Sequence, residues 1–383
     1  MFLAMATVFV GCREDFLDRG NWAPEVHKTL DELIKQEGKS SRHYDTDHRP
    51  YAVFDFDNTT ILSDISVTLM VYQIDSMRFA FPPDSAFKVF TASIDDVDME
   101  LIIPGKEYHL TVRSLAEDLA ADYAVLYGRH DYAHLPEYQD FRVKLWNLAW
   151  GVNCTMDYGT SCLWITTLFD GMTRQEIKAL ARESVMCWQR CGRIWQEEWA
   201  CESLSAKVPK GLALTPEMRS LYQSLKDNGI DVYVCSASLE EVVEAMACDA
   251  VFGLGLDTDH VFGLRVQEHE DGTIKCAFAE GYAQPFKAGK VACIEQNMMP
   301  LQGGRAPILV GGDSNGDYEM LTAFPEMRVG LIINCGNGGG IGELSKQALS
   351  DTQPLRKHKG PKYLLQGRDL KSLAFVPGSG SEK

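Results

Sequence analysis

The chain lacks an excess of basic residues. Its 383 residues include 37 lysines and arginines against 54 aspartates and glutamates, which gives a formal net charge of -17. A nucleic-acid backbone would be repelled by so acidic a protein, so we expect no nucleic-acid partner. No internal repeat or long low-complexity tract is present, and 45% hydrophobic with 24% charged residues is the composition of a globular protein long enough for a core domain and a second, smaller domain.

The N-terminal apolar run is too short to cross a bilayer. Residues 1–11 are almost wholly apolar and end at Cys12. An apolar run that closes on Val-Gly-Cys is similar to a bacterial lipoprotein signal, although no basic region precedes it. We therefore predict a signal-like segment and tether over residues 1–21, with a lipid on Cys12 as the protein's only link to a membrane. This predicts a periplasmic or cell-envelope location; the alternative is a buried N-terminal element in a cytoplasmic protein.

Two other patterns are incomplete or ambiguous. The glycine-rich run at residues 336–340 lacks the lysine and the spacing of a P-loop, so we expect a flexible loop there. Ten cysteines remain besides Cys12, and in an oxidising compartment they could form disulfides. Cys154 and Cys162 flank a short loop, which makes them the favoured pair.

Two carboxylates stand at the exit of an apolar strand. Residues 51–60 read YAVFDFDNTT, in which a buried strand leads directly into acidic, amide and hydroxyl side chains. Because residues two apart on a strand point to the same side, Asp55 and Asp57 can face one pocket. One carboxylate could attack phosphorus while the other moves a proton, with Asn58 and Thr59 beside the substrate. The alternative is a pair of acids that cap a turn.

A hydroxyl and an ammonium group for the same phosphate follow downstream. The apolar, β-branched residues 230–235 predict a buried strand that ends at Ser236 and Ala237. Lys287 and Lys290 begin an amphipathic stretch. We favour Lys290, because the helix that follows it should place its side chain near an N-terminus that attracts anions, whereas Lys287 is expected to be solvated. Serine and lysine would bind the phosphoryl oxygens, where charge accumulates during transfer.

A second pair of carboxylates, Asp313 and Asp317, follows the predicted strand at residues 307–312. Ligands of doubly wound α/β sheets bind outside the carboxyl ends of the strands, so all these segments are expected to converge. A phosphate monoester repels an incoming carboxylate, and oxygen-only ligands favour a hard cation. We therefore expect Mg²⁺ bound by Asp55, Asp313 and Asp317, with the backbone carbonyl at Asp57.

Together these four segments resemble the four motifs of the haloacid dehalogenase superfamily, in the same order. The resemblance implies Asp55 as the nucleophile, Asp57 as the acid and base, and hydrolysis of a small phosphomonoester through an aspartyl-phosphate. It also implies the fold class: α/β, with a doubly wound, Rossmann-like parallel sheet and a helical cap inserted after the first strand, as in the phosphoserine-phosphatase-like branch.

Within that branch, residues 51–59, 168–173 and 228–237 are similar to the bacterial phosphorylcholine phosphatases. Phosphocholine is therefore one candidate substrate. The loop at residues 312–317 is closer to the phosphoserine phosphatase form, so a phosphoserine-like or broad specificity is the alternative. A non-catalytic binding protein with the same fold is an alternative of another class.

Helical patterns fill the long segment between the first two core strands. We predict core segments at residues 22–62 and 213–376, a helical cap at 63–212 and a disordered tail at 377–383. The predicted helices cover residues 24–36, 111–127, 141–150, a segment opened by a capping box at Thr173–Glu176, and one from Thr215-Pro216 to Gly229.

Aromatic residues in the cap could bind a cation. Trp146, Trp150 and Trp164, with Asp157 and Tyr158 between them, would suit a quaternary ammonium group, which sits over aromatic rings. The alternative is that Trp146 and Trp150, four apart on a helix, simply pack into the cap core. An amino-acid phosphate would instead call for an arginine near an acid.

Overall fold

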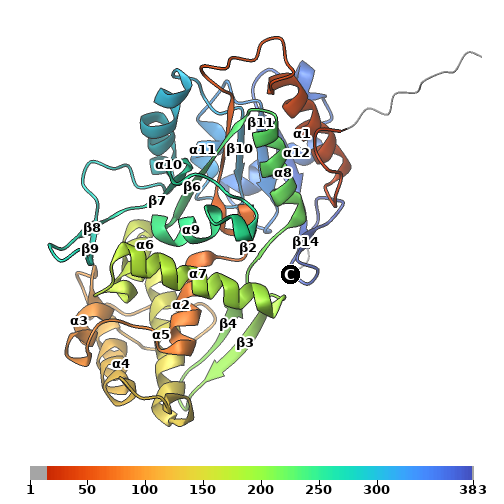
Figure 1. Cartoon of the computed structure of the whole chain (residues 1–383). Helices are drawn as coiled ribbons and strands as arrows, with labels where there is room; N and C mark the ends of the chain where they lie inside the picture. Colours follow the sequence, from red (N-terminus) through yellow and green to blue (C-terminus); the bar gives the residue numbers. More distant parts are fainter. Residues whose placement is uncertain (1–14, 382–383) are drawn as a thin grey trace, which may run out of the picture.

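The central sheet has six strands, all parallel to their neighbours (Figure 1). The computed structural model describes residues 15–381. The sheet strands are β1 (Tyr51–Phe54), β6 (Asp231–Leu239), β7 (Val261–Leu264), β10 (Leu309–Gly312), β11 (Val329–Ile333) and β12 (Lys362–Gln366). Their order across the sheet is β12-β11-β10-β1-β6-β7. The predicted parallel α/β sheet is therefore confirmed.

Helices cover both faces of this sheet, which is why its strands are mostly apolar. Along β1, Ala52 and Phe54 belong to one buried cluster, and Tyr51 and Val53 to another on the opposite face. The first face packs against α1 (Pro24–Glu37), α8 (Pro216–Asp227) and α9 (Glu240–Ala247), and the second against α10 (Ala288–Cys293), α11 (Tyr318–Thr322) and α12 (Gly340–Ser350).

The strand order reverses at β1. From β1 the chain builds outward through β6 and β7, then returns to the other side of β1 and continues through β10, β11 and β12. In such sheets the crevice at the carboxyl ends of the strands beside the reversal is where ligands bind. Asp55 follows β1, Asp313 follows β10, and Ser236 lies in the second half of β6. The topology thus brings the predicted motifs to one edge.

A mainly helical cap occupies the chain between β1 and β6, as predicted (Figure 1). Its helices are α2 (Ile65–Ser76), α3 (Ala86–Thr91), α4 (Val112–Leu126), α5 (Pro136–Thr155), α6 (Tyr158–Thr166) and α7 (Arg174–Cys191). The chain then forms an antiparallel hairpin of β3 (Trp195–Ala200) and β4 (Ser205–Lys210), which the helical patterns did not indicate. A short pair, β2 (Ile61–Leu62) and β5 (Ala213–Leu214), joins the entry and the exit of the cap.

Helix starts follow the predicted capping chemistry. At α7 the Thr173 side chain accepts from the backbone N–H of Glu176, while the Glu176 side chain accepts from the Thr173 N–H. At α8 the Thr215 side chain accepts from the N–H of Met218, and proline occupies the first turn. Gly229 follows the end of α8 with φ of 76°, a left-handed conformation that glycine adopts at little steric cost. The helices predicted at these positions are confirmed.

A second hairpin reaches from the core to the cap. It is formed by β8 (Val266–Glu268) and β9 (Ile274–Phe278), which follow β7. The N–H of Ile274 donates to the carbonyl of Met172 at 2.9 Å, and Thr273 pairs with Thr173 in an isolated bridge. The sequence patterns did not predict this hairpin, which gives the cap a contact with the core besides its two connecting segments.

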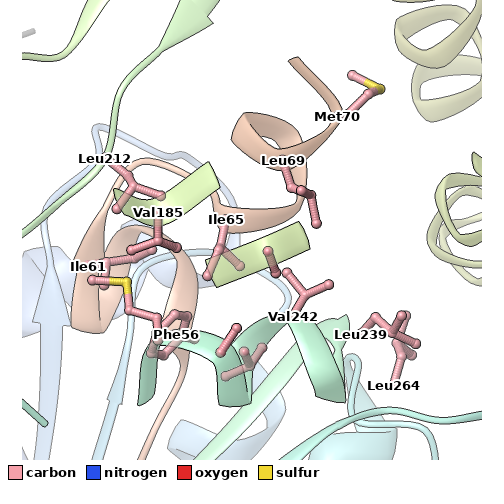
Figure 2. Packing of buried hydrophobic residues seen from close by; sticks show 14 of the residues in the cluster. Phe56, Ile61, Ile65, Leu69, Met70, Val185, Leu212, Leu239, Val242 and Leu264 are labelled. Carbon is pink, nitrogen blue, oxygen red and sulfur yellow. The ribbon is translucent and has the colours of Figure 1, made fainter. Parts of the chain in front are cut away.

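Apolar side chains and ion pairs fasten the cap to the core. Figure 2 shows Ile65 of α2 and Val185 of α7 in the same buried cluster as Phe56, next to the end of β1, and Val242 of α9. Three ion pairs then run along α7 to α9 and the turn after it: Arg174 with Glu241, Lys178 with Glu244, and Arg182 with Asp249. These pairs add charge contacts to the apolar packing between α7 and α9.

The predictions for the two ends of the chain have different outcomes. Cys12 and the predicted signal lie outside the described residues, so the lipid and the location stay predictions. Residues 377–381 differ from the predicted disorder: the carbonyl of Gly378 accepts from Gly367 N–H at 2.8 Å, and the carbonyl of Ser379 accepts from Asn334 Nδ2 at 2.6 Å. These two bonds hold part of the tail against the loops after β11 and β12.

The part of the chain that the structure describes contains ten cysteines, and all of them are free. Cys154 on α5 and Cys162 on α6 are among them, so the predicted disulfide is wrong. The two thiols have different surroundings, because Cys162 contacts the Tyr158 hydroxyl.

Over residues 15–381, no helix is both long and apolar enough to cross a membrane.

Candidate active site

Asp55 is fixed where β1 leaves the sheet. Its backbone N–H donates to Gly311 O at 3.0 Å, and its carbonyl accepts from the Thr60 hydroxyl at 2.7 Å. The Thr59 hydroxyl lies 3.3 Å from both Asp55 Oδ2 and Asp313 Oδ1 and can donate to either. The hydroxyl residues after the two aspartates therefore hold the predicted nucleophile and join it to Asp313.

Lys290 lies between two of the carboxylates. Its Nζ is 2.7 Å from Asp55 Oδ1 and 2.6 Å from Asp317 Oδ1, and the side chain is almost fully buried. Lys287 is exposed, and its Nζ lies 5.2 Å from the ring centre of Tyr158. Of the two candidate lysines, the structure therefore places Lys290 at the predicted nucleophile.

Asp317 organises the loop after β10. Its Oδ2 accepts from the N–H groups of Asp313 and Ser314, both at 3.0 Å, while its Oδ1 accepts from Lys290. A Cβ on Gly312 would lie only 2.5 Å from the Cβ of Asp317, so the close turn requires glycine there. Because both oxygens of Asp317 already accept hydrogen bonds, its main effect is to position Lys290 and Asp313.

The carboxyl of Asp57 has a different set of partners. Oδ1 accepts from the N–H of Ile65 at the start of α2, and Oδ2 accepts from the Ser238 hydroxyl, each at 2.6 Å. The Ser66 hydroxyl in turn donates to Ser238 Oγ at 2.8 Å. Asp57 is thus held by a cap helix and by β6, separate from the Asp55–Lys290 pair. Both carboxyl oxygens of Asp57 already accept hydrogen bonds, so its predicted contact with a metal would come from the backbone carbonyl.

Burial changes the proton affinities of these acids. Burial and then the Asp317 charge raise the pKa of Asp55 from 3.8 to about 7, against the opposing effect of Lys290. Burial, followed by the charges of Asp64 and Asp55, raises the pKa of Asp57 well above its usual range. Burial opposes the charged form of Lys290, but Asp317 and Asp55 outweigh it and raise its pKa. The site therefore holds a charged lysine beside carboxyls that bind protons unusually well.

The same carboxyls fit a divalent cation. Asp55, Asp313 and Asp317 each offer an oxygen, and these oxygens lie within 4.8 Å of one another. Burial, then Asp317 and Asp55, raises the pKa of Asp313 well above its usual range, which shows that this oxygen cluster has too little positive charge nearby. Mg²⁺ prefers hard oxygen ligands and would supply that charge. Asp55 and Asp313 are the best placed to hold it, with Asp317 behind them.

Ser236 and Ala237 lie on β6 beside this cluster. Ser236 is fully buried, and its hydroxyl oxygen accepts from the Ser238 N–H at 3.1 Å, which leaves the hydroxyl hydrogen to donate. Ala237 is half-buried. The sequence predicted Asn58 beside the substrate. In the structure its side-chain oxygen instead accepts a hydrogen bond from Arg368 Nη1 at 2.9 Å.

The structure does not gather the three tryptophans around the site. Trp164 is almost fully buried in the cap, where its Nε1 donates to Phe90 O at 2.9 Å. Trp146 packs edge-on against Trp199, and Trp150 is 44% exposed. Trp146 and Trp164 thus have the surroundings of cap core residues, as the alternative interpretation expected for Trp146.

Tyr158 is the cap aromatic that approaches the carboxylates. It begins α6, and its hydroxyl lies 3.8 Å from where a Cβ of Gly316 would be. Burial and then Cys162 raise the pKa of Tyr158, and the charges of Lys290 and Asp55 also act on it. The ring stacks at a tilt on Phe286, with centres 5.6 Å apart. An aromatic pair from cap and core therefore borders the site.

The chain matches the family of haloacid dehalogenase-like hydrolases over residues 158–322. That range contains Ser236, Lys290, Asp313 and Asp317. The matched range is less than half of the chain. Together with the doubly wound sheet and the clustered carboxylates, it shows that the chain is similar to haloacid dehalogenase-like hydrolases.

Two similar proteins put this similarity in context. The phosphorylcholine phosphatase of Pseudomonas aeruginosa is 26% identical in an alignment 205 residues long that covers 47% of this chain; the chain spans only 57% of that protein's length. The crystal structure of a conserved protein of unknown function from Anaerococcus prevotii is 26% identical, with a TM-score of 0.84 over 97% of this chain and 99% of the other. The whole fold, cap included, therefore recurs in that bacterial protein.

Several residues at the site were not predicted from the sequence. Ser238 carried a usable signal, because it is two residues beyond Ser236 and so points to the same side of the strand. Tyr158 was noticed only as part of an aromatic group. Cys335, which contacts the Asp313 carboxyl, lies in the loop after β11, and Arg368 begins the short strand β13 (Arg368–Asp369) after β12; neither carried a local pattern.

Proposed function

We propose that the protein hydrolyses a small phosphomonoester through a covalent aspartyl-phosphate on Asp55, with Mg²⁺ as its cofactor. The observation that carries the proposal is the different environment of the two aspartates after β1. Asp55 is paired with Lys290, while Asp57 is held apart from that pair by Ser238 and the start of α2.

The roles follow from these contacts. Asp55 attacks phosphorus, and its ion pair with Lys290 fixes the orientation of the attacking oxygen. Asp57 keeps its proton because of burial, so it can donate that proton to the leaving alcohol and then accept one from water. The hydroxyl hydrogen of Ser236 and the ammonium group of Lys290 would bind the transferring oxygens. A bound Mg²⁺ would neutralise the negative charge shared by phosphate and carboxylates.

Phosphocholine is the substrate we propose first. The similarity to a phosphorylcholine phosphatase supports it. So does the ring of Tyr158, since the exposed ammonium of Lys287 already lies over it. A quaternary ammonium group of the substrate could take that place. A phosphoserine-like or broad specificity is the second candidate, supported by the loop at residues 312–317, whose sequence is closer to the phosphoserine phosphatase form.

Phosphate release tests the proposal. Purified protein is assayed with phosphocholine, phosphoethanolamine, phosphoserine, glycerol phosphate and a chromogenic ester, in Mg²⁺ and in EDTA. We expect Mg²⁺-dependent release that is fastest with phosphocholine. Equal rates across the panel would support the broad-specificity alternative. No release from any ester, by a protein that still binds phosphate, would favour a non-catalytic binding protein.

Tyr158→Ala tests the substrate contact, with Tyr127→Ala as its matched control. Tyr127 is a cap tyrosine that is 48% exposed. We expect Tyr158→Ala to raise KM for phosphocholine about tenfold, the loss of roughly 1–2 kcal/mol of cation–π attraction, and to change KM for glycerol phosphate much less. Equal increases for both esters would mean that the ring only shapes the entrance.

A further inference from the structure

The backbone between Asp57 and Asn58 adopts a conformation that few residues tolerate. Asp57 has φ −71° and ψ 132°, and Asn58 has φ 57° and ψ 0°. These are the values of the two central residues of a type II turn, whose second position requires positive φ and therefore favours glycine or asparagine. In a type I turn the peptide between the two residues would face the opposite way. The turn type thus sets the direction of the Asp57 carbonyl and affects the aim of its carboxyl.

One arginine from the far end of the chain contacts this turn. Arg368 Nη1 lies 2.9 Å from Asn58 Oδ1 and 3.4 Å from Asn58 O, so it can donate to both oxygens. The side chain is buried, with 8% of the residue exposed. Its backbone N–H donates to the Ser381 hydroxyl at 3.0 Å, and that hydroxyl donates to Asn334 O. The C-terminal segment thereby holds Arg368 against the turn.

We propose that Arg368 is a positioning residue that keeps the Asp57–Asn58 turn in its type II form, and so fixes the direction of the Asp57 carbonyl, which is a predicted metal ligand. The inference rests on the proposed function only for the identity of the cation. Arg368 is not assigned any contact with substrate. Nη1 carries two N–H groups and so can donate to the side-chain oxygen and the backbone oxygen of Asn58, while the planar guanidinium stays charged and rigid, which a lysine ammonium on its flexible stem does not match.

Arg368 contacts Asn58, the residue directly after the Asp57 carbonyl that is predicted to bind the cation. Groups that orient ligands in this way commonly change metal affinity by about 10–100-fold when they are removed.

Metal binding tests the role without turnover. Mn²⁺, used in place of Mg²⁺, is titrated into the protein and followed by electron paramagnetic resonance. We expect Arg368→Met to weaken Mn²⁺ binding about tenfold or more and Arg368→Lys to weaken it less. Lys371→Met, an exposed cation of the same segment, is the matched control and should bind Mn²⁺ as the parent protein does.

Asn58→Gly supplies the decisive comparison, because glycine adopts positive φ without help. If Arg368 acts by holding the turn, adding Asn58→Gly to Arg368→Met should restore Mn²⁺ affinity to within about threefold of the parent. In the ester assay Arg368→Met should lower kcat and leave KM nearly unchanged. Should Arg368→Met fail to fold, Arg368→Lys with and without Asn58→Gly gives the same comparison.

Three results would overturn the inference: parental Mn²⁺ affinity in Arg368→Met, no recovery in the double variant, or a raised KM with unchanged kcat, which would make Arg368 a substrate ligand. A failure of the proposed function can be told apart from a failure of this inference. A parent protein that binds Mn²⁺ and shows the Arg368 effect, yet hydrolyses no ester, would reject the phosphatase proposal and retain the positioning role.

Discussion

Asp55 and Asp57 are two residues apart, yet their side chains meet different partners. The type II turn after Phe56 separates them, so that Asp55 stays with Lys290 while Asp57 accepts from Ile65 N–H and Ser238. An alternating strand pattern would have placed both carboxyls on one side. The sequence therefore predicts which residues carry the chemistry, and the backbone turn gives the two carboxyls different partners.

Replacing Ser238 by alanine should change when Asp57 loses its proton. The Ser238 hydroxyl donates to the Asp57 carboxylate and so favours its ionised form. In Ser238→Ala the pKa of Asp57 should rise further, because a group that lowered it is gone. The value of kcat should rise with pH as Asp57 becomes able to accept a proton from water. We expect this rise to occur at higher pH in Ser238→Ala than in the parent protein.

The control for this pH profile is Ser66→Ala, whose hydroxyl contacts Ser238 and not Asp57. The pH profile of kcat should shift less in Ser66→Ala than in Ser238→Ala. A Ser238→Ala protein with the parental pH profile would show that Asp57 is not the group that limits the rate.

At the scale of elements, the sequence predicted helices better than hairpins. The capping boxes and the Thr-Pro start identified α7 and α8, because these local contacts need only four residues in order. The two hairpins β3–β4 and β8–β9 were missed. The connection of the first, residues 201–204, contains neither glycine nor proline, whereas the second contains Asp271-Gly272, a turn signal that could have indicated it. The tryptophans show a related limit: helical spacing gives a buried face but does not say whether that face lines a site or a core.

The ion pairs along α7 should differ in their contributions to stability. Glu241 of α9 is buried and accepts from Arg174, whereas Arg182 and Asp249 are more exposed. Arg174→Met would leave a buried carboxylate without its partner, at a cost of about 1–3 kcal/mol in the free energy of unfolding. Arg182→Met should cost no more than about 1 kcal/mol.

Urea unfolding followed by circular dichroism measures both ion-pair variants. Equal losses for Arg174→Met and Arg182→Met would contradict the difference in burial. A loss confined to the exposed pair would reject the fastening role of Arg174.

At the scale of the whole molecule, the site couples stability to pH and metal. The pKa of Asp55 is raised from 3.8 to about 7, and those of Asp57 and Asp313 are also raised, so the metal-free folded protein binds more protons than the unfolded chain between these values. Stability of the metal-free protein should therefore fall as pH rises through this window. Mg²⁺ should restore more stability at pH 8 than at pH 5, because it binds the ionised carboxylates.

Thermal melts in EDTA and in Mg²⁺ at both pH values test this coupling. Asp313→Asn, which removes one acid and one metal ligand, should show a smaller Mg²⁺ effect and a weaker loss of Tm with pH. A Mg²⁺-induced rise in Tm that is the same at pH 5 and pH 8 would contradict the coupling.

The most direct test of the central claim is to look for the covalent intermediate. The Asp57→Asn protein is mixed with Mg²⁺ and a radiolabelled chromogenic phosphate ester, quenched in acid and digested. We predict that label accumulates on the peptide containing Asp55, is released by hydroxylamine, and is absent from Asp55→Asn, because Asp55 forms the phosphoenzyme and Asp57 activates the water that breaks it. Turnover of the ester without any label, or label on another residue, would contradict the account.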